Sequence, residues 1–133
     1  MPPDLNEVRR WLEKADHDRG GAEAAIERNP PITDVAAFHC QQAVEKLLKG
    51  YLLFRGQPFE KTHDLVELLA LCTQYDDAFS LLRASVEPLT PYAVRFRYPG
   101  PADPSVAEVN VAMQAVQTVW KFVNDRLPAQ TRL

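Results

Sequence analysis

The stretch that decides the fold is FHCQQAVEKLLKGYLLFR, residues 38–55. Its apolar side chains recur three, four and seven residues apart, as in a helix with one buried face. Together with the residue before it, that stripe comprises Ala37, Cys40, Val44, Leu47, Leu48, Tyr51 and Leu52. Thr33 and Asp34 can cap the start of this helix, and Gly56 followed by Pro58 ends it. We expect it to be the central helix of a bundle.

A first helix is predicted over residues 4–28. Asp4 is placed to cap it, with Glu7 three residues later in a capping-box arrangement. Gly20 and Gly21 interrupt its apolar stripe, and each lowers helix propensity by about 1 kcal/mol relative to alanine. The two glycines therefore indicate either a bend or a close contact with a neighbouring helix.

Two helices are predicted between the central helix and the proline-rich loop. Asp64 is placed to cap the third helix, with Glu67 as its capping-box partner. Asp76 or Asp77 begins a fourth helix, which Pro88 is expected to kink or end because proline lacks the amide donor. The dipeptide 90–91, threonine and proline, is typical of a fresh short turn of helix.

The last helix has the clearest pattern in the chain. Ser105 and Glu108 form a capping box, and an apolar stripe follows at alternating steps of three and four. The stripe comprises Val106, Val109, Met113, Val116, Trp120, Val123 and Leu127. A second partial stripe that includes Val111 widens the apolar face, as in a helix that is central or shared with a second subunit. The predicted fold is all-α: an antiparallel up-and-down bundle of four long helices plus a short one.

Composition places the chain among ordinary globular proteins. It has 133 residues, 46% hydrophobic and 25% charged, with a net charge of −3, so its total charge does not imply a broad nucleic-acid face. Cys40 and Cys72 fall on apolar helical positions and are expected to be buried free thiols. No signal-peptide pattern and no apolar run of about 20 residues is present, so we expect a cytoplasmic protein without a membrane span.

The common kinds of catalytic and metal site find little support in the sequence. The soft metal ligands, among them His17, His39 and His63, show no i, i+4 pair and no C-x2-C spacing. Nucleophilic catalysis is disfavoured because periodicity buries both cysteines, and no phosphate-binding glycine loop is present. We therefore expect no catalytic residues of these kinds, no metal and no cofactor.

The remaining polar residues fall into three clusters. The first, expected on the exposed side of the central helix, contains His39, Gln42, Lys46 and Lys49. The second leads into the third helix and contains Lys61, His63 and Asp64; the third precedes the proline-rich loop and contains Arg95, Arg97 and Tyr98. The last two clusters could simply be a helix-start network and a solvated loop. Alternatively, these cations and the helix amides at 64–66 converge on a phosphate or an acidic partner surface.

Taken in order, these residues resemble the HEPN family (higher eukaryotes and prokaryotes nucleotide-binding domain), most closely its small stand-alone prokaryotic branch. The matching segments are Ala37–Leu52, Thr62–Leu65 with Leu68 and Leu69, and Tyr92 with Arg97–Pro99. The resemblance covers nearly the whole chain and implies one helical domain, residues 1–133 with a core of about 4–127. It also implies a homodimer, and a minimal nucleotidyltransferase encoded beside the protein; some such pairs are toxin–antitoxin systems.

The resemblance also sets an expectation about catalysis. Many HEPN proteins are metal-independent ribonucleases with an R-x4–6-H motif near the start of the last long helix. Here no histidine follows Arg95 and Arg97, and the literal match of Arg10 with His17 lies in the first helix instead. Relatives tend to read T-R-Y-P-D where this chain has Phe96 and Gly100 in place of the threonine and the aspartate.

The sequence thus leads to one main functional hypothesis and two alternatives. The main one is a non-catalytic HEPN homodimer that binds a nucleotide or another phosphate-containing ligand and acts with a nucleotidyltransferase. Its ligand-binding residues are predicted to be Lys49, Lys61, His63, Asp64, Arg97 and Tyr98, with Gln42, Lys46 and Arg95 as possible additions. The alternatives are a residual RNase or RNA binder that uses Arg95, Arg97 and His63, and a purely structural interaction module.

Overall fold

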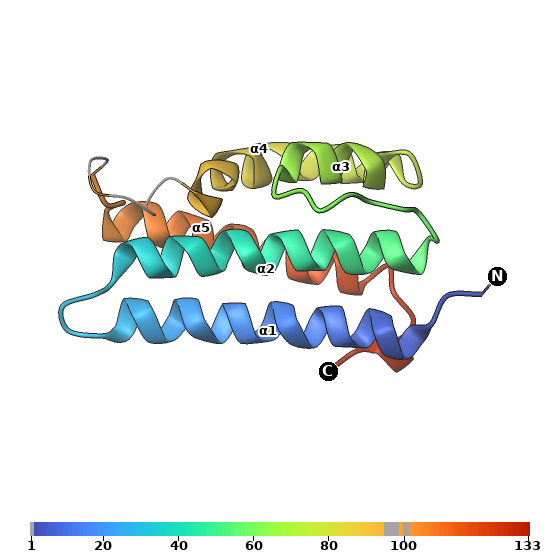
Figure 1. The fold of residues 1–133 in the computed structure, drawn as a ribbon, viewed down its shortest axis with the longest axis horizontal. Helices are drawn as coiled ribbons and strands as arrows, with labels where there is room; N and C mark the ends of the chain where they lie inside the picture. Colours follow the sequence, from blue (N-terminus) through green and yellow to red (C-terminus); the bar gives the residue numbers. More distant parts are fainter. Residues whose placement is uncertain (1, 95–98, 100–101) are drawn as a thin grey trace.

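A computed structural model describes residues 2–94, 99 and 102–133. Within these residues it contains helices and no strand, which confirms the predicted all-α class (Figure 1). The α-helices are α1 (Leu5–Glu27), α2 (Thr33–Phe54), α3 (Leu65–Thr73), α4 (Arg83–Val86) and α5 (Val106–Asn124), and the 3-10 helices are η1 (Asp77–Leu82), η2 (Glu87–Ala93) and η3 (Ala129–Thr131). None of the helices in the described ranges is both long and apolar enough to cross a membrane.

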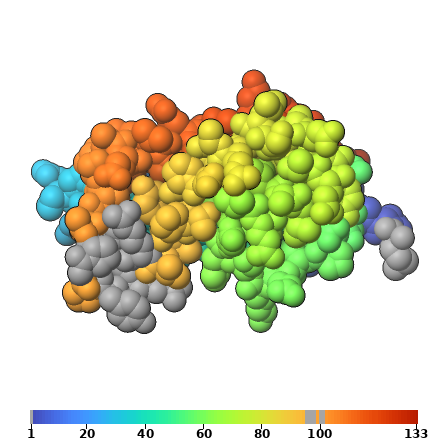
Figure 2. All heavy atoms as spheres, turned by 90° about the horizontal axis from the view of Figure 1, so that it is seen from above, coloured from blue at the N-terminus to red at the C-terminus, as the bar shows by residue number. Residues whose placement is uncertain are grey.

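The helix α2 occupies the centre of the molecule, as its periodicity predicted. It packs along α1 on one side and contacts α3, η2 and α5 on its others (Figure 1). Its apolar stripe, from Ala37 through Leu52, is buried in the core. Seen from above, α3, η1, α4 and η2 form one continuous face of the molecule (Figure 2). Because α2 touches every layer, side chains on its polar side lie where several elements meet.

The chain direction differs from a simple up-and-down bundle. α1 and α2 form an antiparallel pair, but the segment after α2 returns along that helix before α3 begins (Figure 1). As a result α3 and α5 run in the same direction as α2. Gly56, at φ 71°, ends α2, and residues 57–64 are irregular, which gives the chain the length to return.

The predicted fourth long helix is instead a composite of short pieces. Asp76 caps it as expected, through its side chain and the amide of Ala78, but η1, α4 and η2 follow one another in place of a single α-helix. α4 ends two residues before Pro88, which has no amide hydrogen with which to continue the α-helical hydrogen bonds. The expected new turn at residues 90–91 is wrong, since η2 continues through Pro91.

The helix caps are mostly those predicted. Asp4 and Asp64 each accept two amide hydrogen bonds, and Ser105 forms a complete capping box with Glu108. The predicted cap of α2 is wrong: this helix begins at Thr33 and has no side-chain cap. Asp34 lies in its first turn, where a negative charge is favourable.

The long α5 packs its stripe into the core, apart from its first member. Val109, Val116 and Val123 are buried, whereas Val106 is exposed because it opens the helix. Val111, on the second stripe, is also exposed. The glycines of α1 lie within a continuous helix rather than at a bend, and Gly21 makes the close contact that was the other expectation.

Candidate functional site

A buried carboxylate on α2, that of Glu45, contacts three other polar side chains of the described part of the chain. Glu45 lies one turn after Gln41 and one before Lys49, so all three share one edge of α2. Its Oε2 is 3.1 Å from Lys49 Nζ, and its Oε1 is 2.8 Å from His63 Nδ1 and 3.1 Å from Gln41 Nε2. Gln41 Nε2 also donates to the His63 carbonyl at 3.2 Å. We call these four residues the Glu45 cluster.

The Glu45 cluster holds one histidine with its ring turned outward. The side chains of Glu45 and Lys49 are 5% and 8% exposed, whereas the side chain of His63 is 56% exposed. Because an ionised carboxylate can only accept, Nδ1 of His63 is the donor in their contact. The neutral imidazole therefore carries its lone pair on Nε2. His63 thus has a fixed ring orientation, and its Nε2 bonds to none of the residues that the structure describes.

The helix start beside His63 is already satisfied by the protein itself. Asp64 Oδ1 accepts from the amides of Val66 and Glu67 at 3.0 and 3.4 Å. The Asp64 amide donates to Thr62 Oγ1 at 3.1 Å, and Thr62 in turn donates to Glu67 at 3.3 Å. Glu67 therefore does not close the capping box that was predicted for it. An incoming phosphate would meet the Asp64 carboxylate at these amides, so the predicted phosphate role of the α3 amides is not supported by this geometry.

A second buried carboxylate lies where α1 meets α2. Asp18 contacts the Nδ1 of His39 at 2.8 Å through Oδ1, and Lys46 through Oδ2. A Cβ added at Gly21 would lie 3.1 Å from three atoms of the His39 ring, so glycine there leaves room for the imidazole. The second cluster therefore repeats the pattern of the first, with one acid shared by a histidine and a lysine.

The predicted site residues are thus brought together only in part. Lys49 is not on an exposed side: it is buried and paired with Glu45, and Lys46 is half-buried and paired with Asp18. The predicted extra residue Gln42 donates to Gln41 Oε1 at 2.7 Å, which links it to the Glu45 cluster. Lys61 is exposed and makes no ion pair within the described residues. The other predicted residues, Arg95, Arg97 and Tyr98, lie outside the residues that the structure describes.

Three residues of these clusters were not singled out from the sequence: Asp18, Gln41 and Glu45. For Asp18, the sequence does contain a signal. Asp18 lies three residues after Ala15 and four before Ala22, so it occupies a position of the apolar stripe of α1. A polar side chain at a buried helical position needs a partner, because burying it unpaired is costly.

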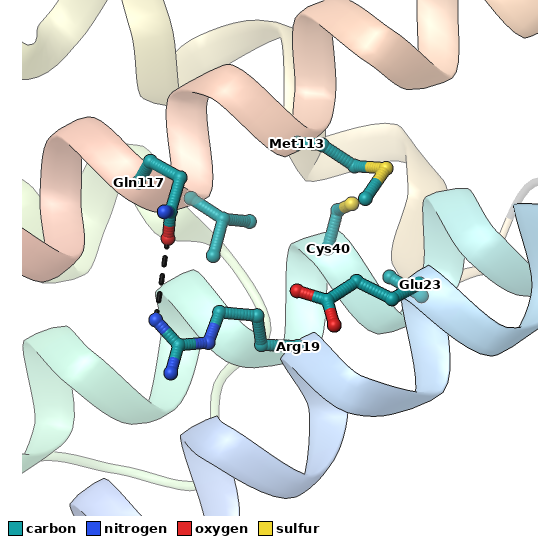
Figure 3. A pocket seen from close by; sticks show the side chains of 7 residues that line it. Arg19, Glu23, Cys40, Met113 and Gln117 are labelled. Atoms are coloured by element: carbon teal, nitrogen blue, oxygen red, sulfur yellow. Dashed lines mark hydrogen bonds between the residues drawn. The ribbon is translucent and has the colours of Figure 1, made fainter.

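A separate pocket of about 210 Å³ lies between α1, α2 and α5 (Figure 3). Ala22, Cys40, Met113 and Val116 supply its apolar wall, and Arg19, Glu23 and Gln117 its polar one. Arg19 donates to Gln117 at 3.3 Å and lies 4.0 Å from the centre of the Trp120 ring.

Burial raises the pKa of the Cys40 thiol to about 12, so this sulfur is not a nucleophile. Cys72 is likewise buried and free, as predicted.

Comparisons with known proteins agree with the sequence pattern. The crystal structure of TT1696 from Thermus thermophilus superposes with a TM-score of 0.80 at 32% sequence identity, over 92% of this chain and 99% of that one. A search of curated proteins gave no match. The model of the HEPN domain matches residues 8–126, which include α2, the Glu45 cluster and all of α5. On this match and on the shared fold, the chain belongs to the HEPN family.

Proposed function

We propose that this HEPN protein binds a nucleotide or another phosphate-containing ligand at the exposed edge of the Glu45 cluster. The observation that carries the proposal is the His63 imidazole, held by a buried carboxylate at 2.8 Å while more than half of its side chain faces solvent. A protonated imidazole so placed can donate from Nε2 to a phosphate oxygen. Lys61, two residues earlier and exposed, supplies a second cation that no described carboxylate neutralises.

The roles of the other predicted residues follow from their surroundings. Lys49 and Lys46 already balance buried carboxylates, so they hold the site in shape rather than contact phosphate. Asp64 shapes the loop by capping α3. We keep Arg97 as a further phosphate contact and Tyr98 as a stacking or anchoring residue, with Arg95 as a possible addition, on the family resemblance alone.

The first test is isothermal titration calorimetry of the purified protein, once with adenosine 5′-monophosphate and once with inorganic phosphate. The variants Lys61→Ala and His63→Gln should both weaken binding, and a matched control, Lys121→Ala on the exposed side of α5, should not. Equal affinities for wild type and both site variants would remove this edge as the binding site.

We further propose that the chain acts as a homodimer, through its long helices, with a minimal nucleotidyltransferase, in a pair of the toxin–antitoxin kind. Support comes from family membership and from the exposed apolar Val111 on α5. Affinity purification from native cell extract, with mass spectrometry of the co-purifying protein and small molecules, tests it. A defined homodimer that carries neither partner nor nucleotide would instead favour a purely structural module.

One observation favours a second candidate function, metal-independent RNA cleavage. A histidine whose Nδ1 is held by a carboxylate has the orientation of a general acid–base group. Incubation of single-stranded RNA with the protein in the presence of a chelator tests this candidate. Cleavage that is lost in His63→Ala and kept in the control Lys121→Ala would support it, and the absence of cleavage by wild type would dismiss it.

A further inference from the structure

We propose that Trp11 is the surface on which the base of the ligand stacks, so that the ligand is a nucleotide or a single-stranded RNA. This inference rests on the proposed function and deepens it, because it adds a base-binding surface to the phosphate-binding edge at Lys61 and His63. Trp11 lies on α1, next to the buried Leu12. In the structure its side chain is half-buried, and part of it remains accessible.

Lys49 lies between Trp11 and the rest of the Glu45 cluster. Lys49 Nζ lies 3.1 Å from the carboxylate that also holds His63. The same ammonium is 6.0 Å from the centre of the Trp11 ring and 5.7 Å from that of Phe59. One buried lysine therefore separates the exposed imidazole from an aromatic pair. A ligand that carries a phosphate and a base could reach both.

The Trp11 ring is held firmly in place. Phe59 meets it edge to face, at a centroid distance of 5.9 Å and an interplanar angle of 78°. At Gly50, an added Cβ would lie 3.3 Å from the Cβ of Trp11, so α1 and α2 approach closely at this level. A rigid ring is a good stacking surface, because little conformational freedom is lost when a base binds.

Beside Trp11 lies an open hollow of about 260 Å³ with a mainly basic rim. Its other lining residues are Glu7, Arg10 and Lys14, which together carry a net charge of +1. Within the described part of the chain, neither Arg10 nor Lys14 forms an ion pair with a carboxylate. An aromatic ring beside unpaired cations is the combination that binds single-stranded nucleic acid, by stacking on bases and by attraction of phosphates.

The other tryptophan of the chain provides a contrast. The guanidinium of Arg19 lies over Trp120 at 4.0 Å from the ring centre and also bonds to Gln117 on α5. Trp120 is thus covered by a cation of its own protein. Among the residues that the structure describes, no cation lies so close to Trp11, since Lys49 is 6.0 Å away and paired with Glu45.

The proposal can be tested by measuring the affinity of the protein for a short fluorescein-labelled oligoadenylate by fluorescence anisotropy. Trp11→Leu should weaken binding about tenfold or more, because stacking contributes about 1–3 kcal/mol per base. Trp11→Phe keeps a ring and should retain most of the affinity. Trp120→Leu is the matched control and should bind as wild type does. Melting temperatures identify folded variants. Trp120→Leu leaves Trp11 as the one tryptophan of the chain, so quenching of its fluorescence by unlabelled oligoadenylate provides a second reading if Trp11→Leu does not fold.

The results separate this inference from the proposed function. If His63→Gln weakens oligoadenylate binding while both Trp11 variants bind as wild type does, the stacking role is overturned and the phosphate site stands. If wild type binds neither oligoadenylate nor adenosine 5′-monophosphate, the proposed function fails and the inference fails with it. A loss in Trp11→Leu for the mononucleotide as well as for the oligomer supports a nucleotide ligand. A loss for the oligomer alone supports RNA.

Discussion

Glu45 and His63 are 18 residues apart in the chain, yet their side chains meet at 2.8 Å across the gap between α2 and the loop that enters α3. The carboxylate belongs to the rigid central helix, and the imidazole to an irregular segment. The contact therefore fixes the position of the loop as well as the direction of the ring. The energetics of this contact can be tested separately from ligand binding.

Removal of the buried carboxylate should destabilise the fold. Glu45→Ala leaves Lys49 buried without its counterion, and breaking a buried pair in this way typically costs about 3–5 kcal/mol. Replacement of both residues, as in Glu45→Leu with Lys49→Met, should recover much of that loss, since an apolar pair needs no compensation. Urea unfolding measures both changes. A double variant no more stable than Glu45→Ala would show that the pair matters for more than charge balance.

The two adjacent glycines of α1 should respond oppositely to alanine. No atom lies within 4 Å of a Cβ added at Gly20, so Gly20→Ala should stabilise the protein by about 1 kcal/mol through helix propensity. At Gly21 the added carbon would lie 3.1 Å from the His39 ring, so that gain should be offset or reversed. Parallel denaturant titrations compare them. Equal stabilisation by both substitutions would mean that His39 moves aside freely.

Asp76 should make stability depend on pH in the acid range. The hydrogen bond from Arg126 at 2.7 Å, helped by the Ala78 amide, lowers the pKa of this carboxyl below its ordinary value of 3.8. The unfolded chain therefore takes up a proton first as the pH falls, and the stabilisation present at neutral pH is lost. Asp76→Asn keeps an acceptor for the cap but cannot titrate.

The stability difference between wild type and Asp76→Asn should thus be constant near neutral pH and shrink as the pH falls below 3.8. Thermal unfolding at a series of pH values checks this. A difference that grows on acidification would contradict the assignment of the shift to the native state.

The two thiols should be inert until the protein unfolds. Burial raises the pKa of both Cys40 and Cys72 to about 12, and neither sulfur is accessible. A disulfide reagent at pH 8 should therefore label them only when denaturant opens the core. Rapid labelling of the native protein would mean that the pocket beside Cys40 admits reagents more freely than its structure indicates.

Local signals in the sequence predicted much of the fold. The caps at Asp4, Asp64, Asp76 and Ser105 and the stripe of α2 depend on near neighbours, and all are present. The shared direction of α2 and α5 was not predicted, because it depends on how the segments between them return the chain. The 3-10 conformation of η1 and η2 was not predicted either, because in short segments it is a close alternative to the α-helix.

The candidate site was predicted less well, for a related reason. Lys49 lies on the same helical stripe as Lys46, so a periodic pattern treats both as exposed. Whether a lysine is covered depends on the neighbouring helix and on the loop that carries Phe59. The acids that pair with these lysines, Asp18 and Glu45, could have been noticed as charges at buried helical positions. Lys49 lies one turn from Glu45 on the same helix, but both partners of Asp18, and His63 beside Glu45, come from other elements.

The composite segment of η1, α4 and η2 has a consequence for motion. Its 3-10 helices are short, and their hydrogen bonds are less well aligned than those of a long α-helix. The amides of this segment should therefore exchange with solvent deuterium before those of α1 and α2. Opening of this layer would leave the pairing of α1 with α2 intact. The protein would then fluctuate most on the face seen in Figure 2, while Asp18, His39 and Lys46 keep their places at the junction of α1 and α2.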